Sequence, residues 1–388
     1  MITVEDALTL VFALVRPLPT EIVPLSCANG RVMPGPAIAN RDQPPFAASA
    51  MDGYAVNGPV TPGATFTVVG EAGAGHAFHG TLSHGQALRI FTGAPVPSGA
   101  MRIIIQEDAD ATATQITVRQ HVDSGNNIRP LGQDFRVGST LSPRLLRPND
   151  IALLAAMNIA ELAVTRRPVV AIIATGDELV MPGETPRPDQ IIASNSFALK
   201  AMVEDAGGIA RMLPIARDTE GSLRTVLKMA FDADLIITIG GASVGDHDLV
   251  GKVASDMGMK RAFYKIAMRP GKPLMAGSLH GVPMLGLPGN PVSAIVCGHL
   301  FMLPMLRAML GLGEHPPQAR TARLTVDLSA NGPRAHYMRA RLVHDQITPF
   351  DRQDSALLTI LTEANALLIR PIADASRKVG DAVSYLPL

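Results

Sequence analysis

The sequence predicts a multidomain α/β plus β protein. A central, doubly wound, mostly parallel sheet is accompanied by two β-rich modules and a mixed α/β N-terminal domain. Two patterns lead to this expectation. Between residues 169 and 310, short buried strands alternate with amphipathic helices, which is typical of a parallel sheet covered by helices on both faces. At 58–140, and again after Pro316-Pro317, short strands are separated by turns rich in Gly and Pro, as in β-rich modules.

Length and composition restrict the class of protein. A chain of 388 residues exceeds one ordinary core and predicts two to four domains. Its 34 basic and 34 acidic residues balance, so charge gives no reason to expect nucleic acid or a membrane as partner. Two cysteines, Cys27 and Cys297, exclude a disulfide framework. The N-terminus lacks the features of a signal peptide, and no apolar run looks long enough to cross a bilayer, so we expect a soluble cytoplasmic protein.

The elements follow from hydrophobic periodicity and helix-end signals. Residues 3–15 predict an amphipathic helix that starts with a capping box variant formed by Thr3 and Asp6 and ends before Pro17. The segment 142–160 also has a helical pattern. In the C-terminal β module we expect one short helix near 355–362. In the central region we expect strands at 169–174, 209–215, 235–239, 262–267, 273–278 and 282–287, and helices near 195–206, 220–231, 248–257 and 291–310.

The stretch DLIITIGGASVGDHD carries the clearest sign of a binding site. Its apolar run, 235–239, is typical of a strand buried on both faces of a parallel sheet. Gly240 and Gly241 follow the strand and allow the backbone to approach a bound group closely, and Ser243 and Asp248 come next. Ligands of open α/β sheets lie at the carboxyl ends of the strands, so this loop is a candidate site.

Two further loops have the same position relative to a predicted strand. TGDEL follows 169–174 and supplies Thr175 and Glu178. Strand 282–287 runs into Pro288-Gly289-Asn290-Pro291 and a long helix, where we expect Asn290 to cap and Pro291 to occupy the first helical position. Backbone N–H groups and Ser293 would then face outward at the positive end of the helix dipole, which suits phosphate or another oxyanion.

The combined loops predict an oxyanion site next to acidic groups. RPGKP adds the cations Arg269 and Lys272, and the acids are Glu178, Asp248 and Asp218. Carboxylates beside phosphate-binding groups usually hold a bridging Mg²⁺, so we expect Glu178 and Asp248 to bind this ion together. No Walker A lysine motif is present, which excludes an ordinary P-loop NTPase.

Three polar loops lie outside the central region. Asp52 precedes Gly53 in SAMDGYAV, Thr92 begins TGAPVP, and Asp134 ends NIRPLGQD. An Asp-Gly pair by itself favours a turn, and loops carry polar groups beside Gly and Pro whether or not they bind a ligand. The residues alone therefore leave both a structural and a functional role open.

Taken in order, SAMDGYAV, TGAPVP, NIRPLGQD, TGDEL, GGASVGDHD, RPGKP and LPGNPVSA resemble the molybdopterin molybdenumtransferase family, which includes the MoeA proteins and the gephyrin E domain. The resemblance covers essentially the whole chain. It implies that molybdate is inserted into adenylylated molybdopterin with Mg²⁺ assistance and release of AMP. It also implies a homodimer whose active site is shared between the central domain of one subunit and the β-rich domain of the other. Molybdopterin adenylyltransferase and molybdoenzymes become candidate protein partners.

The resemblance also implies domain bounds and residue roles. Residues 1–44 and 141–166 would form a mixed α/β domain, 45–140 an inserted β-rich domain, 167–315 a molybdopterin-binding α/β domain, and 316–388 a β-barrel-like domain. The implied catalytic residues are Asp52, Asp134, Glu178, Asp218 and Asp248. The implied substrate-binding residues are Thr92, Thr175, Gly240, Gly241, Ser243, Arg269, Lys272, Pro288, Gly289, Asn290, Pro291 and Ser293.

Some positions depart from the family pattern, and two rival functions stay open. Arg269 stands where a lysine is usual, and Gln133 and Ala193 replace usual acids. One rival is a divergent paralogue that acts as a cofactor-binding scaffold or chaperone. The other is a nucleotide-processing enzyme that shares only the central domain, either CinA-like or a molybdopterin adenylyltransferase. The motifs at Asp52 and Thr92 and the C-terminal β module favour the transferase over the second rival.

Overall fold

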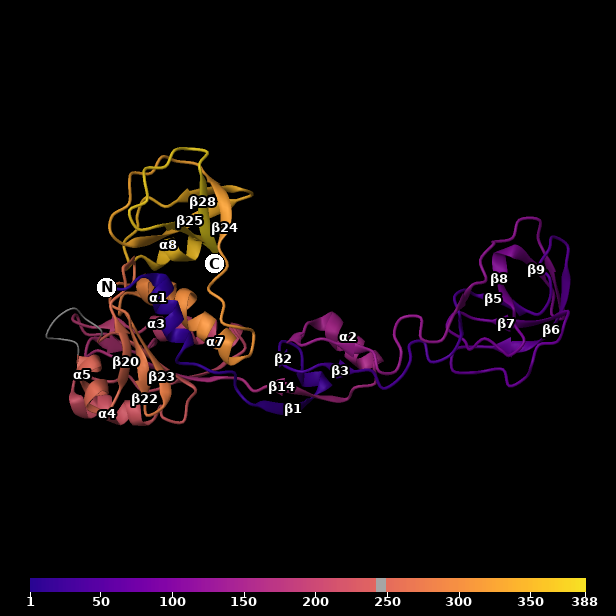
Figure 1. The fold of residues 1–388 in the computed structure, drawn as a ribbon, viewed down its shortest axis with the longest axis horizontal. Helices are drawn as coiled ribbons and strands as arrows, with labels where there is room; N and C mark the ends of the chain where they lie inside the picture. Colours follow the sequence, from indigo (N-terminus) through magenta and orange to yellow (C-terminus); the bar gives the residue numbers. More distant parts are fainter. Residues whose placement is uncertain (242–248) are drawn as a thin grey trace. The chain divides into compact units, whose positions relative to one another are not determined.

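The computed structural model describes residues 1–241 and 249–388. The chain divides into two compact units (Figure 1). The first comprises Met1–Glu21, Gly30–Pro34 and Val164–Leu388, and the second comprises Ile22–Asn29 and Gly35–Ala163. Strands β1 (Thr20–Pro24) and β14 (Glu161–Thr165) pair, and the division between the units falls within them.

The first unit contains the predicted mostly parallel sheet, with strand order β18-β15-β19-β23-β22-β20. The first four strands of this order run parallel, whereas β22 is antiparallel to both of its neighbours. The continuous apolar runs become strands whose residues are almost all buried, as expected of a sheet covered on both faces. The bounds are β15 (Val169–Ala174), β18 (Ile209–Met212), β19 (Leu235–Ile239), β20 (Lys260–Tyr264), β22 (Met275–Leu279) and β23 (Val282–Leu287).

Helices cover both faces of this sheet, so the doubly wound arrangement is confirmed (Figure 1). On one face, α4 (Glu220–Lys228) and α5 (Leu249–Asp256) pack over Ile173, Ile236 and Met284. On the other face, α3 (Asn195–Asp205) and a long helix pack over Ile172, Ile237 and Leu285. The short strands β16 (Leu179–Val180) and β17 (Ile191–Ile192) pair beside the sheet.

The long helix consists of α6 (Pro291–Cys297), a π-helical stretch η3 (Gly298–Met302) and α7 (Leu303–Met309). Its 19 residues are long and apolar enough to cross a membrane by length and composition alone, contrary to the expectation that no run of the sequence would reach that length. Within the molecule, 78% of its most apolar 18-residue window is buried. Leu300, Phe301 and Met305 pack in the same core as the central sheet, which accounts for the apolar composition.

The N-terminal helix α1 (Val4–Phe12) begins with the predicted capping box. The Asp6 N–H donates to the Thr3 hydroxyl oxygen at 3.1 Å, and the Thr3 N–H donates to the Asp6 carboxylate at 3.2 Å. We expected residues 1–44 to form one domain with 141–166. Instead, the buried side chains of α1 pack into the core of the central domain, in the same cluster as residues of the long helix.

The C-terminal strands form a closed barrel, as expected of a β-barrel-like domain. The ring closes because β25 (Ala335–Val343) pairs with both β26 (Gln346–Pro349) and β27 (Ala366–Arg370). The other two strands of the barrel are β24 (Arg320–Leu324) and β28 (Ala382–Pro387). From the central domain, β21 (Met268–Arg269) pairs in parallel with β25. The short helix α8 (Leu358–Glu363) lies beside the barrel (Figure 1).

The second unit is β-rich. Its sheet has the order β8-β5-β7-β6-β10-β9, and separate hydrophobic clusters form around Leu88 and around Phe66. The strands of the sheet are β5 (Gly53–Val56), β6 (Thr65–Ala72), β7 (Gln86–Ile90), β8 (Arg102–Ile105), β9 (Ala109–Ala111) and β10 (Gln115–Val118). Shorter elements of this unit are β3 (Ala37–Ile38), β4 (Ala48–Ser49), β11 (Ile128–Arg129), β12 (Thr140–Leu141), β13 (Arg144–Leu145) and the helix α2 (Pro148–Ala156), whereas β2 (Val32–Met33) belongs to the first unit.

Candidate active site

A cavity of about 870 Å³ lies in the first unit, where β15, β19 and β23 end. The loops that follow these three strands all reach it, as expected for an open α/β sheet. The residues singled out from the sequence that line the cavity are Thr175, Glu178, Asp218, Gly240, Gly241, Pro288, Gly289, Asn290 and Pro291. Their functional roles remain predictions, but the structure brings them together.

Thr175 joins the loops that follow β15 and β19. Its backbone N–H and its hydroxyl donate to the Ile239 carbonyl at 3.0 and 3.3 Å, and its side chain is buried. Gly240 and Gly241 have φ angles of +90° and +64°. A Cβ at Gly241 would come within 2.2 Å of Val250, so no larger residue fits at this turn.

Two acidic residues hold the loops after β15 and β18 to each other. The Asp218 N–H donates to the Asp177 carboxylate at 3.2 Å, and the Asp177 N–H donates to the Asp218 carboxylate at 3.4 Å. Arg217, which sequence analysis missed, donates to the carbonyls of Gly176, Asp177 and Leu179 at 3.0–3.4 Å. Glu178 and Asp218 keep exposed carboxylates in the cavity lining.

The loop after β23 differs from the expectation at two residues. Asn290 occupies the N-cap position and Pro291 the first turn, as predicted, but the Asn290 side chain makes no cap. Its amide donates instead to the Ser355 hydroxyl at 3.0 Å, and the Val292 N–H donates to the Ser355 carbonyl at 3.0 Å. Ser293 does not face outward, since it is only 4% exposed. The barrel segment around Ser355 covers the start of the helix and occupies donors that we expected to be free.

Asn195 was not identified as a site residue from the sequence, although it lines the cavity. It is the first residue of α3, and its side-chain amide donates to the Gly289 carbonyl at 2.7 Å. This bond fixes the Pro288–Pro291 turn against a second helix. The polar pair Ser194-Asn195 at the start of a predicted helix was the available signal.

Arg339 on β25 is a third residue that sequence analysis missed. Its side chain is fully buried, and one guanidinium nitrogen donates to the carbonyls of Asp354 at 2.9 Å and Arg352 at 3.4 Å. Its Nε and Nη1 have no hydrogen-bond partner in the described part of the chain. Burial lowers the pKa of this guanidinium. Buried donors without partners are rare, and an arginine with free N–H groups is well suited to bind an anion.

Arg269 and Lys272 do not line the cavity, although Pro273 beside them does. The Arg269 guanidinium donates to the Asn331 side chain at 3.1 Å. Its pKa is lowered by burial and then by the neighbouring cations Arg334 and Arg370. The barrel end therefore gathers positive charge around Arg269.

Two predicted site residues, the substrate-binding Ser243 and the Mg²⁺ ligand Asp248, lie outside the described residues. Within residues 1–241 and 249–388, no group of three or more His, Cys, Asp or Glu side chains could hold a metal ion. Mg²⁺ usually takes only one or two protein carboxylates and completes its shell with water and phosphate oxygens. The exposed carboxylates of Glu178 and Asp218 in one cavity lining fit that donor set.

The second unit brings three sequence motifs together around Asp52. The Thr92 N–H and hydroxyl both donate to one Asp52 carboxylate oxygen, at 2.7 and 2.8 Å. Ser49 in β4 pairs with Ile128 in β11, which brings the third motif alongside. These hydrogen bonds lower the pKa of Asp52, since they stabilise its ionised form.

Asp134 lies on the third of these motifs in the second unit and is exposed. Its backbone N–H donates to the Gln43 carbonyl at 2.9 Å, which fixes the loop. The catalytic role that the sequence resemblance implies for Asp134 remains a prediction.

The fold and the cavity define a protein built around a molybdopterin-binding type of α/β domain. Residues 171–308 match the model of the probable molybdopterin binding domain, residues 2–158 the MoeA N-terminal region (domain I and II), and residues 321–388 the MoeA C-terminal region (domain IV). The chain belongs to the MoeA family of molybdopterin molybdenumtransferases.

Similar proteins span the full chain. Molybdopterin molybdenumtransferase 2 of Mycobacterium tuberculosis is 37% identical over 389 residues, covering 96% of each chain. Molybdopterin molybdenumtransferase of a Nostoc species is 35% identical over 410 residues and covers 100% of this chain and 94% of its own. A solved structure of the molybdopterin biosynthesis MoeA protein from Pyrococcus horikoshii, 26% identical, covers 100% of both chains with a TM-score of 0.84.

Proposed function

We propose that this protein is a molybdopterin molybdenumtransferase that transfers molybdenum from molybdate to adenylylated molybdopterin and releases AMP. The family assignment and the names of the full-length relatives support this reaction class. The observation that carries the proposal is the buried guanidinium of Arg339, whose Nε and Nη1 lack partners. Arg339 donates to the carbonyl of Asp354. The next residue, Ser355, covers the start of α6, and Ala356 lines the cavity.

Arg339 would bind the oxyanion. Molybdate is a doubly charged tetrahedral oxyanion, and a guanidinium with free N–H groups matches it in charge and donor geometry. Arg339 donates to the Asp354 carbonyl, and the next residue, Ser355, contacts Asn290 at the cavity. Lys272 lies in the turn before β22, two residues ahead of the buried Leu274. Its ammonium group would add positive charge beside the oxyanion.

Glu178 and Asp218 would act at the adenylyl phosphate. In the reaction, an oxygen of water or of molybdate forms a bond to a phosphorus of the phosphoanhydride that links molybdopterin to AMP. The bridging P–O bond breaks at the same time, so AMP is released and the phosphate stays on the molybdopterin. Mg²⁺, when bound, would neutralise phosphate charge. The two carboxylates, with Asp248 as the further candidate, would hold the ion and its water ligands, and the Asp177–Asp218 hydrogen bonds would keep the Asp218 loop in place.

The substrate also needs groups that the first unit does not supply, and we assign these to Asp52, Thr92 and Asp134 of a second copy of the chain. The support is the exposed carboxylate of Asp52, which two hydrogen bonds from Thr92 hold in one direction and whose pKa they lower. A homodimer with shared active sites follows from this assignment.

The proposal is tested by AMP release from adenylylated molybdopterin with and without molybdate. We expect AMP release coupled to formation of the molybdenum-containing cofactor, and activation of an apo-molybdoenzyme by the product. If AMP is released from adenylylated molybdopterin at the same rate with and without molybdate, the protein is a nucleotide-processing enzyme and the proposal is wrong. A folded dimer that binds molybdopterin without turnover would instead identify a scaffold.

A further inference from the structure

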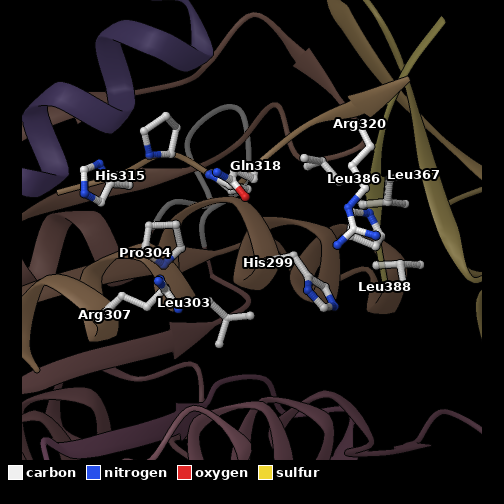
Figure 2. A pocket seen from close by; sticks show the side chains of 13 residues that line it. His299, Leu303, Pro304, Arg307, His315, Gln318, Arg320, Leu367, Leu386 and Leu388 are labelled. Carbon is white, nitrogen blue, oxygen red and sulfur yellow. The ribbon is translucent and has the colours of Figure 1, made fainter. Parts of the chain in front are cut away.

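A second cavity, of about 410 Å³, lies in the first unit between the long helix and the C-terminal barrel (Figure 2). It shares no lining residue with the candidate active site. Its volume falls in the range of small-molecule sites. The lining residues are His299, Leu303, Pro304, Arg307, His315, Pro316, Pro317, Gln318, Arg320, Leu367, Leu386, Pro387 and Leu388.

The cavity begins where the long helix departs from α-helical geometry. His299 lies in the π-helical stretch η3, and the wider turn there changes the direction in which side chains leave the helix. Pro304 follows in the first turn of α7, where its missing N–H is tolerated. Single π-helical turns are rare and occur frequently at functional sites. The irregular turn and the cavity are therefore two independent features at one place.

The chemistry of the lining is apolar and cationic. Leu303, Leu367 and Leu386 supply apolar surface from the helix and from two barrel strands. Arg307 and Arg320 carry positive charge, and in Figure 2 the Arg320 side chain lies on the same side of the cavity as His299, whereas Arg307 lies toward His315. The lining contains no Asp or Glu.

These cations are also free of partners. In the part of the chain that the structure describes, neither an ion pair nor a side-chain hydrogen bond engages Arg307, Arg320, His299 or His315. Elsewhere in the first unit, arginines such as Arg166, Arg211 and Arg370 are paired with carboxylates. Two exposed arginines beside leucines, with no Asp or Glu among the lining side chains, give the side chains of this cavity a net positive charge that attracts an anion from solution.

We propose that this cavity binds a small amphipathic anion, with an apolar body against Leu303, Leu367 and Leu386 and a carboxylate, sulfonate or phosphate at Arg320. The site is separate from the candidate active cavity and does not depend on the reaction proposed there. Hydrophobic burial supplies part of the affinity, and the charge-assisted bond to Arg320 selects anions over neutral analogues.

The test uses the full-length protein and fluorine NMR. The probe is 4-(trifluoromethyl)benzoate, and its neutral counterpart is 4-(trifluoromethyl)benzyl alcohol. We expect saturable line broadening of the benzoate and at least fivefold weaker binding of the alcohol. Arg320→Gln should weaken benzoate binding at least fivefold, whereas Arg167→Gln, an exposed arginine of the same unit outside the cavity, should leave it unchanged.

Three results would overturn the proposal. Equal binding of the benzoate and the alcohol would remove the role of charge. Equal benzoate binding by the parent and Arg320→Gln proteins, each shown to be folded by its thermal transition, would place the probe elsewhere. Inorganic phosphate that competes as well as benzoate itself would remove the role of the apolar body. None of these measurements requires transferase activity, so failure here is distinct from failure of the proposed reaction.

Discussion

Thr92 donates two hydrogen bonds to the same carboxylate oxygen of Asp52, one from its backbone N–H at 2.7 Å and one from its hydroxyl at 2.8 Å. The two residues are 40 positions apart, and each looked like an ordinary loop residue when the sequence was taken alone. Together the bonds fix the direction of the carboxylate and lower its pKa. Asp52 is therefore held ionised and oriented on the surface of its unit.

Removing one of these donors should slow turnover without unfolding the protein. Thr92→Val keeps the backbone N–H but loses the hydroxyl, so we expect turnover to fall roughly 3- to 10-fold, in line with the loss of one charge-assisted bond. The acid limb of the pH–rate profile should move to higher pH, because the donors stabilise ionised Asp52. Thr67→Val, at an exposed threonine of the same unit, is the matched control. An unshifted acid limb would contradict this role.

Arg339 should control the molybdate requirement. We expect Arg339→Met to raise the molybdate concentration for half-maximal activity by roughly tenfold or more, since a bidentate charged donor is lost. Stability should be unchanged or higher, because the parent buries a guanidinium with two unpartnered nitrogens. Activity is titrated with molybdate, and unfolding with urea. Arg323→Met, an exposed arginine of the same barrel, serves as control. A parent-like molybdate titration would refute the assignment.

Glu178 and Asp218 should determine the Mg²⁺ requirement. Both carboxylates line the active cavity, and Mg²⁺ prefers oxygen ligands of this kind. Glu178→Gln should increase the Mg²⁺ concentration for half-maximal AMP release by roughly tenfold, the scale expected for a metal ligand or its supporting group. Asp256→Asn, on α5 of the same domain, should not change it. If Mg²⁺ titrations of Glu178→Gln and parent coincide, the ion binds elsewhere.

The sequence determined the central sheet because its strands are continuous apolar runs, and β15, β19 and β23 occupy the predicted residues. The convergence of their loops also followed, since parallel strands end at one edge. The site residues that were missed, or whose environment was predicted wrongly, depend on contacts outside their own stretch of sequence. Arg339, Asn195 and the covered Ser293 acquire their environment from segments far away in the chain. Local pattern contains no information on such contacts.

The domain of α1 could not be predicted for the same reason. Its amphipathic pattern predicts a helix with one buried face, and the capping box fixes where it begins. Nothing in that pattern identifies the surface against which the face packs. The long helix gives a second example. Its length and composition would suit a membrane span, and only its position in the core of the central domain accounts for its apolar side chains.

Buried His336 should make stability depend on pH. Burial, and then the positive charges of Arg269, Arg339, Arg370 and Arg334, lower its pKa from 6.5 to about 3. The unfolded chain takes up a proton below pH 6.5 that the folded chain does not, so the free energy of unfolding falls as pH decreases from 6.5 toward 3. His336 alone contributes at most about 1.4 kcal/mol per pH unit.

This dependence is measured by urea unfolding between pH 7.5 and pH 5, a window set by the ordinary histidine pKa of ~6.5. His336→Gln should lose less stability across that range than the parent, because it cannot take up the proton in the unfolded state. His344→Gln, at an exposed histidine of the same barrel, should behave as the parent does. Parallel pH curves for the parent and His336→Gln would show that His336 is not held neutral.

Two inactive variants should complement each other if the active site is shared between subunits. If Asp52 of one copy acts with Glu178 of another, then Asp52→Ala and Glu178→Ala proteins should each be folded and inactive. Both side chains are exposed, and removing them leaves no cavity. Mixing the two variants and allowing subunits to exchange should restore activity, because a heterodimer contains one site with both residues intact. With equal mixing, half of the dimers are heterodimers with one good site of two, so roughly a quarter of parent activity is expected from this assortment. Exchange is followed by mass spectrometry of tagged subunits. Exchanged heterodimers that remain inactive would show that Asp52 and Glu178 do not serve one shared site.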